Sequence, residues 1–227
     1  MLAHQFEESL PVTELKSSRV LPLWLFSRDS PIKEICPREV EAANELPHKR
    51  SKQYQHARGN VRSALSDLFN INPLEIPLDS PPGKAPILRN ELGNISFSHC
   101  NDALLLGWSP NKIGIDIERT DRSFDAKRLA NRFFNEDDRH ELLNLNQEQL
   151  RLKVLEKWIE KEALIKWQKG SMARDLREWS INQESSIAIH RSLNYQVRVY
   201  KLKYKSWSIS IASNQKLDHN HWIICEE

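Results

Sequence analysis

Two acidic residues, Asp116 and Glu118, stand two positions apart in the segment Gly114-Ile115-Asp116-Ile117-Glu118. If this segment is a β-strand, the period of two places both carboxylates on one face, with Cα atoms roughly 6.5 to 7 Å apart. Side chains of unequal length at that spacing can converge on one cation. A half-exposed strand with a polar outer face has the same pattern, so both interpretations stay open for the pair alone.

A third acidic residue, Glu162, lies in a segment with helical periodicity. A helical wheel gathers four charged residues on one side, which predicts that this side faces water. These residues are Lys153, Glu156, Lys157 and Glu160. Glu162 falls nearly opposite, next to the apolar residues Leu155, Trp158, Ile159 and Ile165. A carboxylate in such surroundings needs a cation or a proton, because an isolated buried charge costs on the order of several kcal/mol.

Asp116, Glu118 and Glu162 together offer the oxygen ligands that a hard cation prefers, which predicts a magnesium site. Magnesium keeps its remaining octahedral positions for water and phosphate oxygens. The alternative is a structural ion pair between Glu162 and Lys166, which is one helical turn further along. Both possibilities stay open at this point.

The elements that would position these residues follow from hydrophobic periodicity and from Pro and Gly breaks. We expect strands at residues 21–26, 95–99, 104–108, 113–118, 185–189, 196–200 and 207–212. We expect helices at residues 37–46, 48–69, 125–134 and 147–169. This order predicts an α+β protein with two similar halves, an N-terminal half at residues 1–110 and a C-terminal half with the metal site at residues 111–227.

The overall charge is nearly balanced, with 33 Lys and Arg against 31 Asp and Glu. Such a balance argues against nucleic acid or an anionic membrane as a partner. The three cysteines are far apart and form no CxxC pair, which favours a reducing compartment. Residues 1–19 lack a signal-peptide pattern, and the apolar run at 21–26 is too short to span a bilayer. We therefore expect a cytoplasmic protein that is not bound to a membrane.

Two segments together resemble the signatures of the 4′-phosphopantetheinyl transferases. Residues 114–118 are similar to the GxDxE signature, and residues 158–166, WIEKEALIK, are similar to WxxKExxxK. Further similarities lie in Phe97-Ser98-His99, in Gly83-Lys84-Ala85-Pro86 with one inserted residue, in residues 132–134 and in residues 169–170. The set covers roughly residues 50–215 and resembles the single-chain, Sfp-like branch.

The resemblance implies the 4′-phosphopantetheinyl transferase fold, in which two α/β halves pack with pseudo-twofold symmetry. It implies transfer of the 4′-phosphopantetheine group from coenzyme A to a serine of an apo acyl or peptidyl carrier protein, with release of 3′,5′-adenosine bisphosphate. Magnesium, which manganese can replace, would be the cofactor. We expect the protein to act as a monomer.

The same resemblance assigns roles to individual residues. Asp116, Glu118 and Glu162 would bind the metal, and Glu162 would also accept the proton of the carrier serine. Lys166 would lie near the diphosphate, and Lys161 would contact the substrate or support Glu162.

Coenzyme A would be bound by residues earlier in the chain. Ser98 and His99 would meet its phosphate oxygens, although His99 as a buried structural residue is an alternative. Lys84 would lie near the adenine and 3′-phosphate end, and Arg58 would bind the same substrate. The basic residues before Arg58 align ambiguously, and the candidates are Lys49, Arg50 and Lys52.

Other functions remain open on the sequence alone. A non-catalytic coenzyme A or nucleotide-binding module would also use Lys84, Ser98 and His99, and a metal-dependent phosphodiesterase would also use the three carboxylates. Arg128, Arg132, Phe133 and Arg139 are candidates for a dock for an acidic carrier, although an exposed, salt-bridged helix surface explains them equally well. The sequence does not indicate which carrier is modified.

Overall fold

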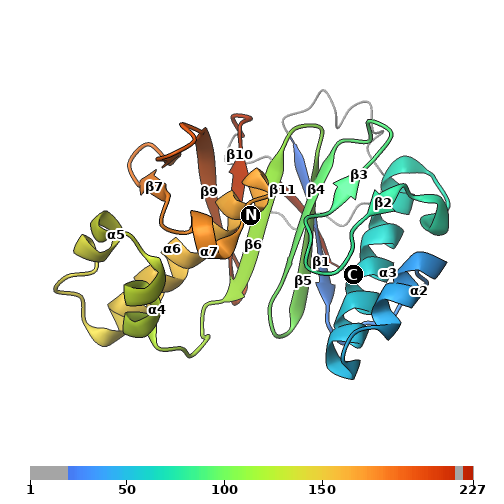
Figure 1. Ribbon diagram of the computed structural model, residues 1–227, viewed down its shortest axis with the longest axis horizontal. Helices are drawn as coiled ribbons and strands as arrows, with labels where there is room; N and C mark the ends of the chain where they lie inside the picture. Colours follow the sequence, from blue (N-terminus) through green and yellow to red (C-terminus); the bar gives the residue numbers. More distant parts are fainter. Residues whose placement is uncertain (1–19, 218–221, 227) are drawn as a thin grey trace. The chain divides into compact units, whose positions relative to one another are not determined.

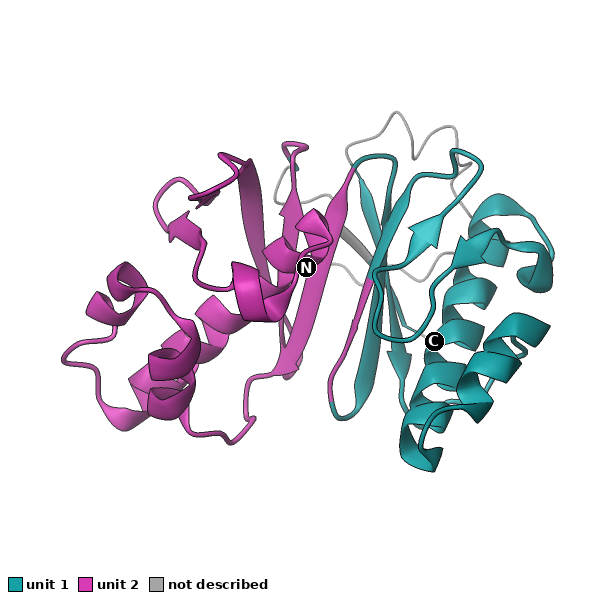
Figure 2. Ribbon diagram, in the orientation of Figure 1, with its two compact units in different colours: residues 1–96, 101–111, 217–227 teal, residues 97–100, 112–216 magenta. Residues whose placement is uncertain are grey.

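The computed structural model describes residues 20–217 and 222–226, and it shows an α+β protein (Figure 1). The predicted fold class is confirmed, whereas the pseudo-twofold relation between the halves stays a prediction. The expectation that residues 1–19 carry no signal peptide lies outside the described residues. The chain forms two compact units: unit 1 comprises residues 1–96, 101–111 and 217–227, and unit 2 comprises residues 97–100 and 112–216 (Figure 2).

Unit 1 contains a four-stranded sheet in the order β11-β1-β5-β4. Its strands are β1 (Leu21–Ser27), β4 (Asn94–His99), β5 (Ala103–Ser109) and β11 (Trp222–Glu226). The residues of β4 from Phe97 onward belong to unit 2. β1 runs antiparallel to β5 and parallel to β11. The apolar sequence of β1 fits this central place, since six of its seven residues are buried.

The helices of unit 1 are α2 (Pro37–Asn44), α3 (His48–Phe69) and the single 3-10 turn η1 (Pro73–Glu75). α2 and α3 are joined by a buried ion pair in which Arg62 Nε lies 2.7 Å from Glu39 Oε2. A short hairpin of β2 (Leu78–Asp79) and β3 (Ile87–Leu88) completes the unit. The hairpin positions the loop that carries Lys84.

Unit 2 contains a five-stranded antiparallel sheet in the order β6-β10-β9-β8-β7. Its strands are β6 (Ile113–Arg119), β7 (Trp179–Asn182), β8 (Ile187–His190), β9 (Gln196–Tyr204) and β10 (Trp207–Ser213). Its helices are α4 (Ala126–Phe133), α5 (Glu136–His140), α6 (Gln147–Gln168) and α7 (Met172–Asp175). α6 packs against β6 and β10 and also against α4, so it lies within the core of this unit.

The prediction that one charged side of α6 faces water is wrong for two of its four residues. Lys157 is 0% exposed and Glu160 is 1% exposed. Lys157 pairs with Asp138 of α5, and Glu160 accepts a hydrogen bond from Gln183. A helical wheel shows which residues of one helix are charged, but it does not show which residues of other elements bury them. Here α5 and the residues after β7 supply those residues.

No helix in the described part of the chain is both long and apolar enough to cross a membrane.

Candidate active site

β6 and α6 meet at Gly114, where the backbone of the helix approaches the strand directly. A Cβ atom on Gly114 would lie 2.0 Å from the Ala163 carbonyl oxygen and 2.4 Å from the Trp167 nitrogen. Real side chains do not tolerate such distances, so only glycine allows this contact. Because Ala163 and Trp167 directly follow Glu162 and Lys166, the contact brings both of these predicted site residues to β6.

Asp116 lies at the centre of the site and is 3% exposed. Its Oδ1 atom accepts hydrogen bonds from Lys166 Nζ at 2.7 Å and from Ser98 Oγ at 2.5 Å. Two predicted site residues, Ser98 of β4 and Lys166 of α6, therefore both contact Asp116 of β6.

Glu118 is partly buried two residues further along β6, and Arg122 donates to its Oε1 atom. Burial is the largest influence on this carboxyl, and it raises the pKa of Glu118 to about 7. The negative charge of Asp116 acts in the same direction, whereas the guanidinium of Arg122 acts against it.

Glu162 belongs to the same electrostatic cluster. Burial, followed by the negative charges of Asp116 and Glu118, raises the pKa of Glu162 to about 8, while the positive charges of Lys166 and Arg122 oppose this. The negative charges of Asp116 and Glu118 thus both act to raise the pKa of Glu162. A raised pKa means that burial favours the protonated form of Glu162, so the expectation that Glu162 binds a cation stays a prediction.

The residue types of this cluster fit a magnesium ion, because all three are hard oxygen donors. In the described residues, however, no group of three His, Cys, Asp or Glu side chains is arranged to hold a metal ion. Asp116 is engaged by Lys166 and Ser98, and Glu118 is engaged by Arg122. Lys166 and Arg122 thus stand beside the three carboxyl groups, and the magnesium site stays a prediction.

Lys161, which was expected to contact the substrate or support Glu162, has a different environment. Its side chain is 0% exposed, and its ammonium pairs with Asp138 Oδ2. The same ammonium donates to the carbonyl oxygens of Leu176 at 3.1 Å and Trp179 at 2.6 Å. Direct contact with a substrate would require Lys161 to leave these contacts, and both expected roles, contact with the substrate and support of Glu162, stay predictions.

The residues expected to bind coenzyme A are placed differently from one another. Ser98 is buried and donates to Asp116, whereas His99 is exposed, which excludes the alternative that it is a buried structural histidine. Lys84 is exposed on a turn in which its backbone nitrogen donates to the Pro81 carbonyl at 3.2 Å and Gly83 has a φ of 75°. A positive φ at the third residue of a turn is what glycine permits.

Arg58 is 5% exposed, so it does not present its guanidinium to solvent. Its Nε and Nη2 atoms donate to the Ser80 carbonyl at 3.1 and 2.8 Å, and the guanidinium lies 4.4 Å from the centre of the Tyr54 ring. These contacts support the loop after β2. A direct role in binding coenzyme A stays a prediction that would require Arg58 to leave them.

A hollow of about 340 Å³ in unit 1 distinguishes among the basic residues before Arg58 whose alignment is ambiguous. Lys49 and Lys52 line it together with Arg28 and His56, whereas Arg50 does not. Among the three candidates for contact with an anionic substrate, the structure therefore groups Lys49 with Lys52.

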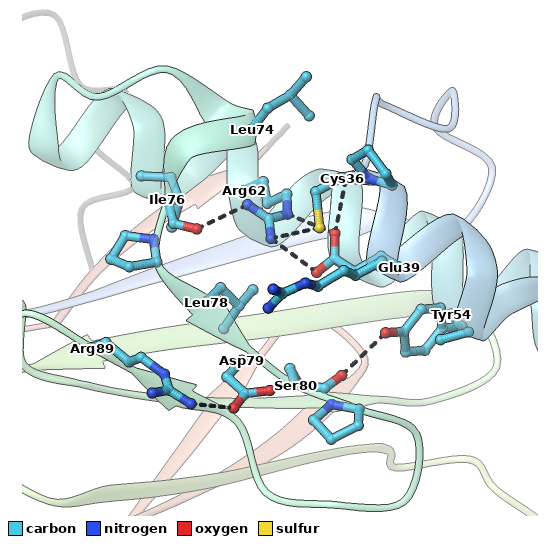
Figure 3. Close-up of a pocket in the computed structure, with 15 residues that line it drawn as sticks. Cys36, Glu39, Tyr54, Arg62, Leu74, Ile76, Leu78, Asp79, Ser80 and Arg89 are labelled. Carbon is cyan, nitrogen blue, oxygen red and sulfur yellow. Dashed lines mark hydrogen bonds and ion pairs between the residues drawn. The ribbon is translucent and has the colours of Figure 1, made fainter.

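A second hollow of unit 1, of about 800 Å³, is lined by residues of α2 and of the segment that leads into the β2–β3 hairpin (Figure 3). Figure 3 shows that its polar groups satisfy one another: Arg62 points to Glu39, and Tyr54 donates to the Ser80 carbonyl. Arg89 pairs with Asp79 in the same way. None of the predicted site residues is among the described residues that line it, so we assign this hollow no part in the site.

Three important residues escaped the sequence-based prediction of roles. Arg122 contacts Glu118, Asp138 pairs with Lys157 and Lys161, and Gly114 allows the approach of α6. The glycine of the GxDxE segment was the available signal, because glycine in a strand often marks a close backbone approach. No pattern in the sequence around Arg122 or Asp138 indicates the contacts that these residues make.

Residues 112–222 match the family model described as the 4′-phosphopantetheinyl transferase superfamily. A search of curated proteins found no match to the chain.

Proposed function

Residues 112–222 match the model of the 4′-phosphopantetheinyl transferase superfamily, and from this match we propose that the protein transfers 4′-phosphopantetheine from coenzyme A to a serine of an apo acyl or peptidyl carrier protein. The observation that carries the proposal is the meeting of Asp116 from β6 with Lys166 from α6 at 2.7 Å. These two residues belong to the two signatures, which are far apart in the sequence. The Sfp-like subtype is part of the proposal.

In this reaction the serine oxygen forms a bond to the β-phosphorus of coenzyme A, and the bond from that phosphorus to the bridging oxygen breaks. The products are the holo carrier protein and 3′,5′-adenosine bisphosphate. Asp116, Glu118 and Glu162 would hold magnesium, which neutralises charge on phosphate oxygens. Mn²⁺ would serve in its place.

Lys166 is the residue we assign to the diphosphate. Its side chain is 28% exposed, so the ammonium can reach a ligand while its stem is held by α6. A fixed cation at a developing negative charge needs no reorganisation during the reaction, which is the main source of its effect.

Glu162 is the residue we assign to the proton of the carrier serine. A general base is most effective when its pKa is near the working pH, and burial beside other carboxylates raises the pKa of Glu162 to about 8. A bound cation would lower this value, because positive charge favours the carboxylate form.

Coenzyme A would be bound by Ser98, His99 and Lys84, with Lys49 and Lys52 as further basic contacts. The carrier would dock on exposed basic residues of α4 and α5, namely Arg128, Arg132 and Arg139. Positive residues at such a dock would mainly speed the encounter with an acidic partner.

The test is incubation with coenzyme A, Mg²⁺ and a panel of apo carrier proteins, with intact mass spectrometry of each carrier. We expect one carrier to gain the mass of one phosphopantetheine, and we expect EDTA or Asp116→Asn to abolish the gain. Release of free phosphopantetheine without any change in carrier mass would instead indicate a phosphodiesterase. Coenzyme A binding with neither product would indicate a non-catalytic module.

Glu162→Gln tests the general base in the same assay at saturating Mg²⁺. We expect turnover to fall about 10²- to 10⁴-fold, the usual contribution of a positioned base. Near-normal turnover would mean that the serine proton goes elsewhere.

A further inference from the structure

Arg122 is a cation at the site that belongs to neither signature. It lies in the turn that follows β6, and its Nη1 atom donates to Glu118 Oε1. The side chain of Glu118 is 18% exposed and that of Arg122 is 36% exposed, so the pair lies at the edge of the cluster. One oxygen of an expected metal ligand is thus engaged by a side chain of the same protein.

The turn that carries Arg122 is held from two sides. The backbone nitrogen of Thr120 donates to the Ser206 carbonyl at 2.9 Å, and that of Arg122 donates to the Arg119 carbonyl at 3.2 Å. Arg151 of α6 donates through Nη1 to the carbonyls of Thr120 at 2.7 Å and Arg122 at 3.0 Å. The backbone of Arg122 is therefore hydrogen-bonded to α6, the helix that also carries Glu162.

These backbone hydrogen bonds affect how strongly Arg122 binds Glu118. An exposed ion pair is usually weak, because two long side chains lose freedom when they are held together. The anchored turn fixes the backbone on one side, and the guanidinium lies 5.6 Å from the centre of the Phe124 ring. The loss of freedom on forming the pair with Glu118 is correspondingly smaller.

A divalent cation and a guanidinium compete for the same carboxylate oxygen, because each compensates the same negative charge. We propose that Arg122 is a positioning residue that binds Glu118 and thereby weakens the binding of divalent metal. The inference rests on the proposed function, because it takes Glu118 as a metal ligand. Metal binding then requires Glu118 to exchange Arg122 for the ion.

Arg119 offers a matched control for the loss of positive charge. Its side chain is 32% exposed, and it lies one residue after Glu118, but its guanidinium pairs with Asp121. Any general repulsion between arginine and a metal ion would be removed to a similar degree by Arg119→Gln and by Arg122→Gln. Only Arg122→Gln removes the contact with Glu118.

The experiment measures the binding of Mn²⁺ alone, by electron paramagnetic resonance and calorimetry at low ionic strength, with thermal melts to verify folding. We expect Arg122→Gln to bind Mn²⁺ about three- to tenfold more tightly than the unaltered protein, because a partly exposed ion pair no longer competes. Arg119→Gln should stay within about twofold, and Arg122→Lys should fall between them. The gain should shrink in high salt, which screens the pair.

Each other outcome overturns a defined part of the inference. Equal or weaker Mn²⁺ binding by Arg122→Gln overturns it, and so does an equal gain in Arg119→Gln. If the unaltered protein, Arg122→Gln and Arg119→Gln all bind no Mn²⁺, the metal site of the proposed function fails and the inference fails with it. If the unaltered protein binds Mn²⁺ and Asp116→Asn does not, the metal site stands whatever Arg122 does.

Discussion

Lys166 Nζ lies 2.7 Å from Asp116 Oδ1, although the two residues are 50 positions apart in the chain. The contact joins the strand β6 to the helix α6, and the same oxygen of Asp116 accepts a hydrogen bond from Ser98. This contact orients Lys166 toward the carboxyl group of Asp116. The predictions below begin with this pair and extend to the residues that support it.

Replacement of Lys166 by methionine should lower kcat about 10²- to 10³-fold, the usual loss when one preorganised group at a developing charge is removed. The fold should persist, because the side chain is partly exposed and its stem is retained. The rate of carrier modification at saturating coenzyme A measures the effect. Lys203→Met, at an exposed lysine of β9, is the control and should leave the rate unchanged.

Gly114→Ala should separate β6 from α6. The added Cβ atom would lie 2.0 Å from the Ala163 carbonyl oxygen, and neither backbone can move without disturbing the core. We expect a loss of about 3 kcal/mol or more in the free energy of unfolding, measured by urea titration.

Gly83→Ala separates this clash from the general cost of replacing glycine. Gly83 has a positive φ but nothing within 4 Å of the added atom, so the loss there should be only about 1 kcal/mol. Similar losses at both positions would contradict the close contact at Gly114.

Lys161→Met should destabilise the protein strongly, because it leaves the buried carboxylate of Asp138 with less compensation. We expect a loss of about 3–5 kcal/mol. The double variant, Lys161→Met with Asp138→Asn, should lose less free energy of unfolding than Lys161→Met alone. In the double variant the charge of Asp138 is removed together with its partner Lys161. Activity per folded molecule should change little, and a loss of activity in a fully folded Lys161→Met protein would support a catalytic role.

The stability of the protein should depend on pH through His56, whose side chain is 7% exposed. Burial lowers the pKa of His56 below its usual value of 6.5, and the positive charges of Arg28 and Lys33 act in the same direction. A lowered pKa means that the folded protein favours the neutral ring. The contribution is therefore complete above pH 6.5 and is lost as the pH falls through the pKa of the folded state.

Urea titrations of the unaltered protein and of His56→Gln between pH 8 and pH 5 measure this contribution. The free energy of unfolding of the unaltered protein minus that of His56→Gln should fall as the pH decreases, with a slope of at most about 1.4 kcal/mol per pH unit. A difference that stays constant over this range would show that His56 is not held neutral.

Charge reversal at the proposed carrier dock, Arg132→Glu with Arg139→Glu, should raise the KM for the carrier much more than the KM for coenzyme A. Both side chains are exposed, and Arg132 stacks on Phe133 with its guanidinium 4.9 Å from the ring centre. The increase should be smaller at high salt, because electrostatic steering is screened. Lys203→Glu is the charge-matched control, and equal effects on both substrates would rule out this dock.

Periodicity was sufficient for the elements that carry the site. The predicted helix at residues 48–69 matches α3, and the predicted strand at residues 113–118 extends by one residue to form β6. These segments are long or strictly alternating, so local pattern alone defines them. β11 and α5 were not predicted, because β11 gains its partner from the opposite end of the chain and α5 has only five residues.

The sequence by itself determined the α+β class and the identity of the residues in the two signatures, since both are written in local pattern and spacing. Only the tertiary structure decided which charges are buried and what each of them contacts. Lys161 and Lys166 lie on the same helix, yet one is enclosed by Asp138 and two carbonyls while the other reaches Asp116. The reason is that the partner of a buried charge comes from a segment far away in the chain, and no local sequence pattern predicts which segment that is.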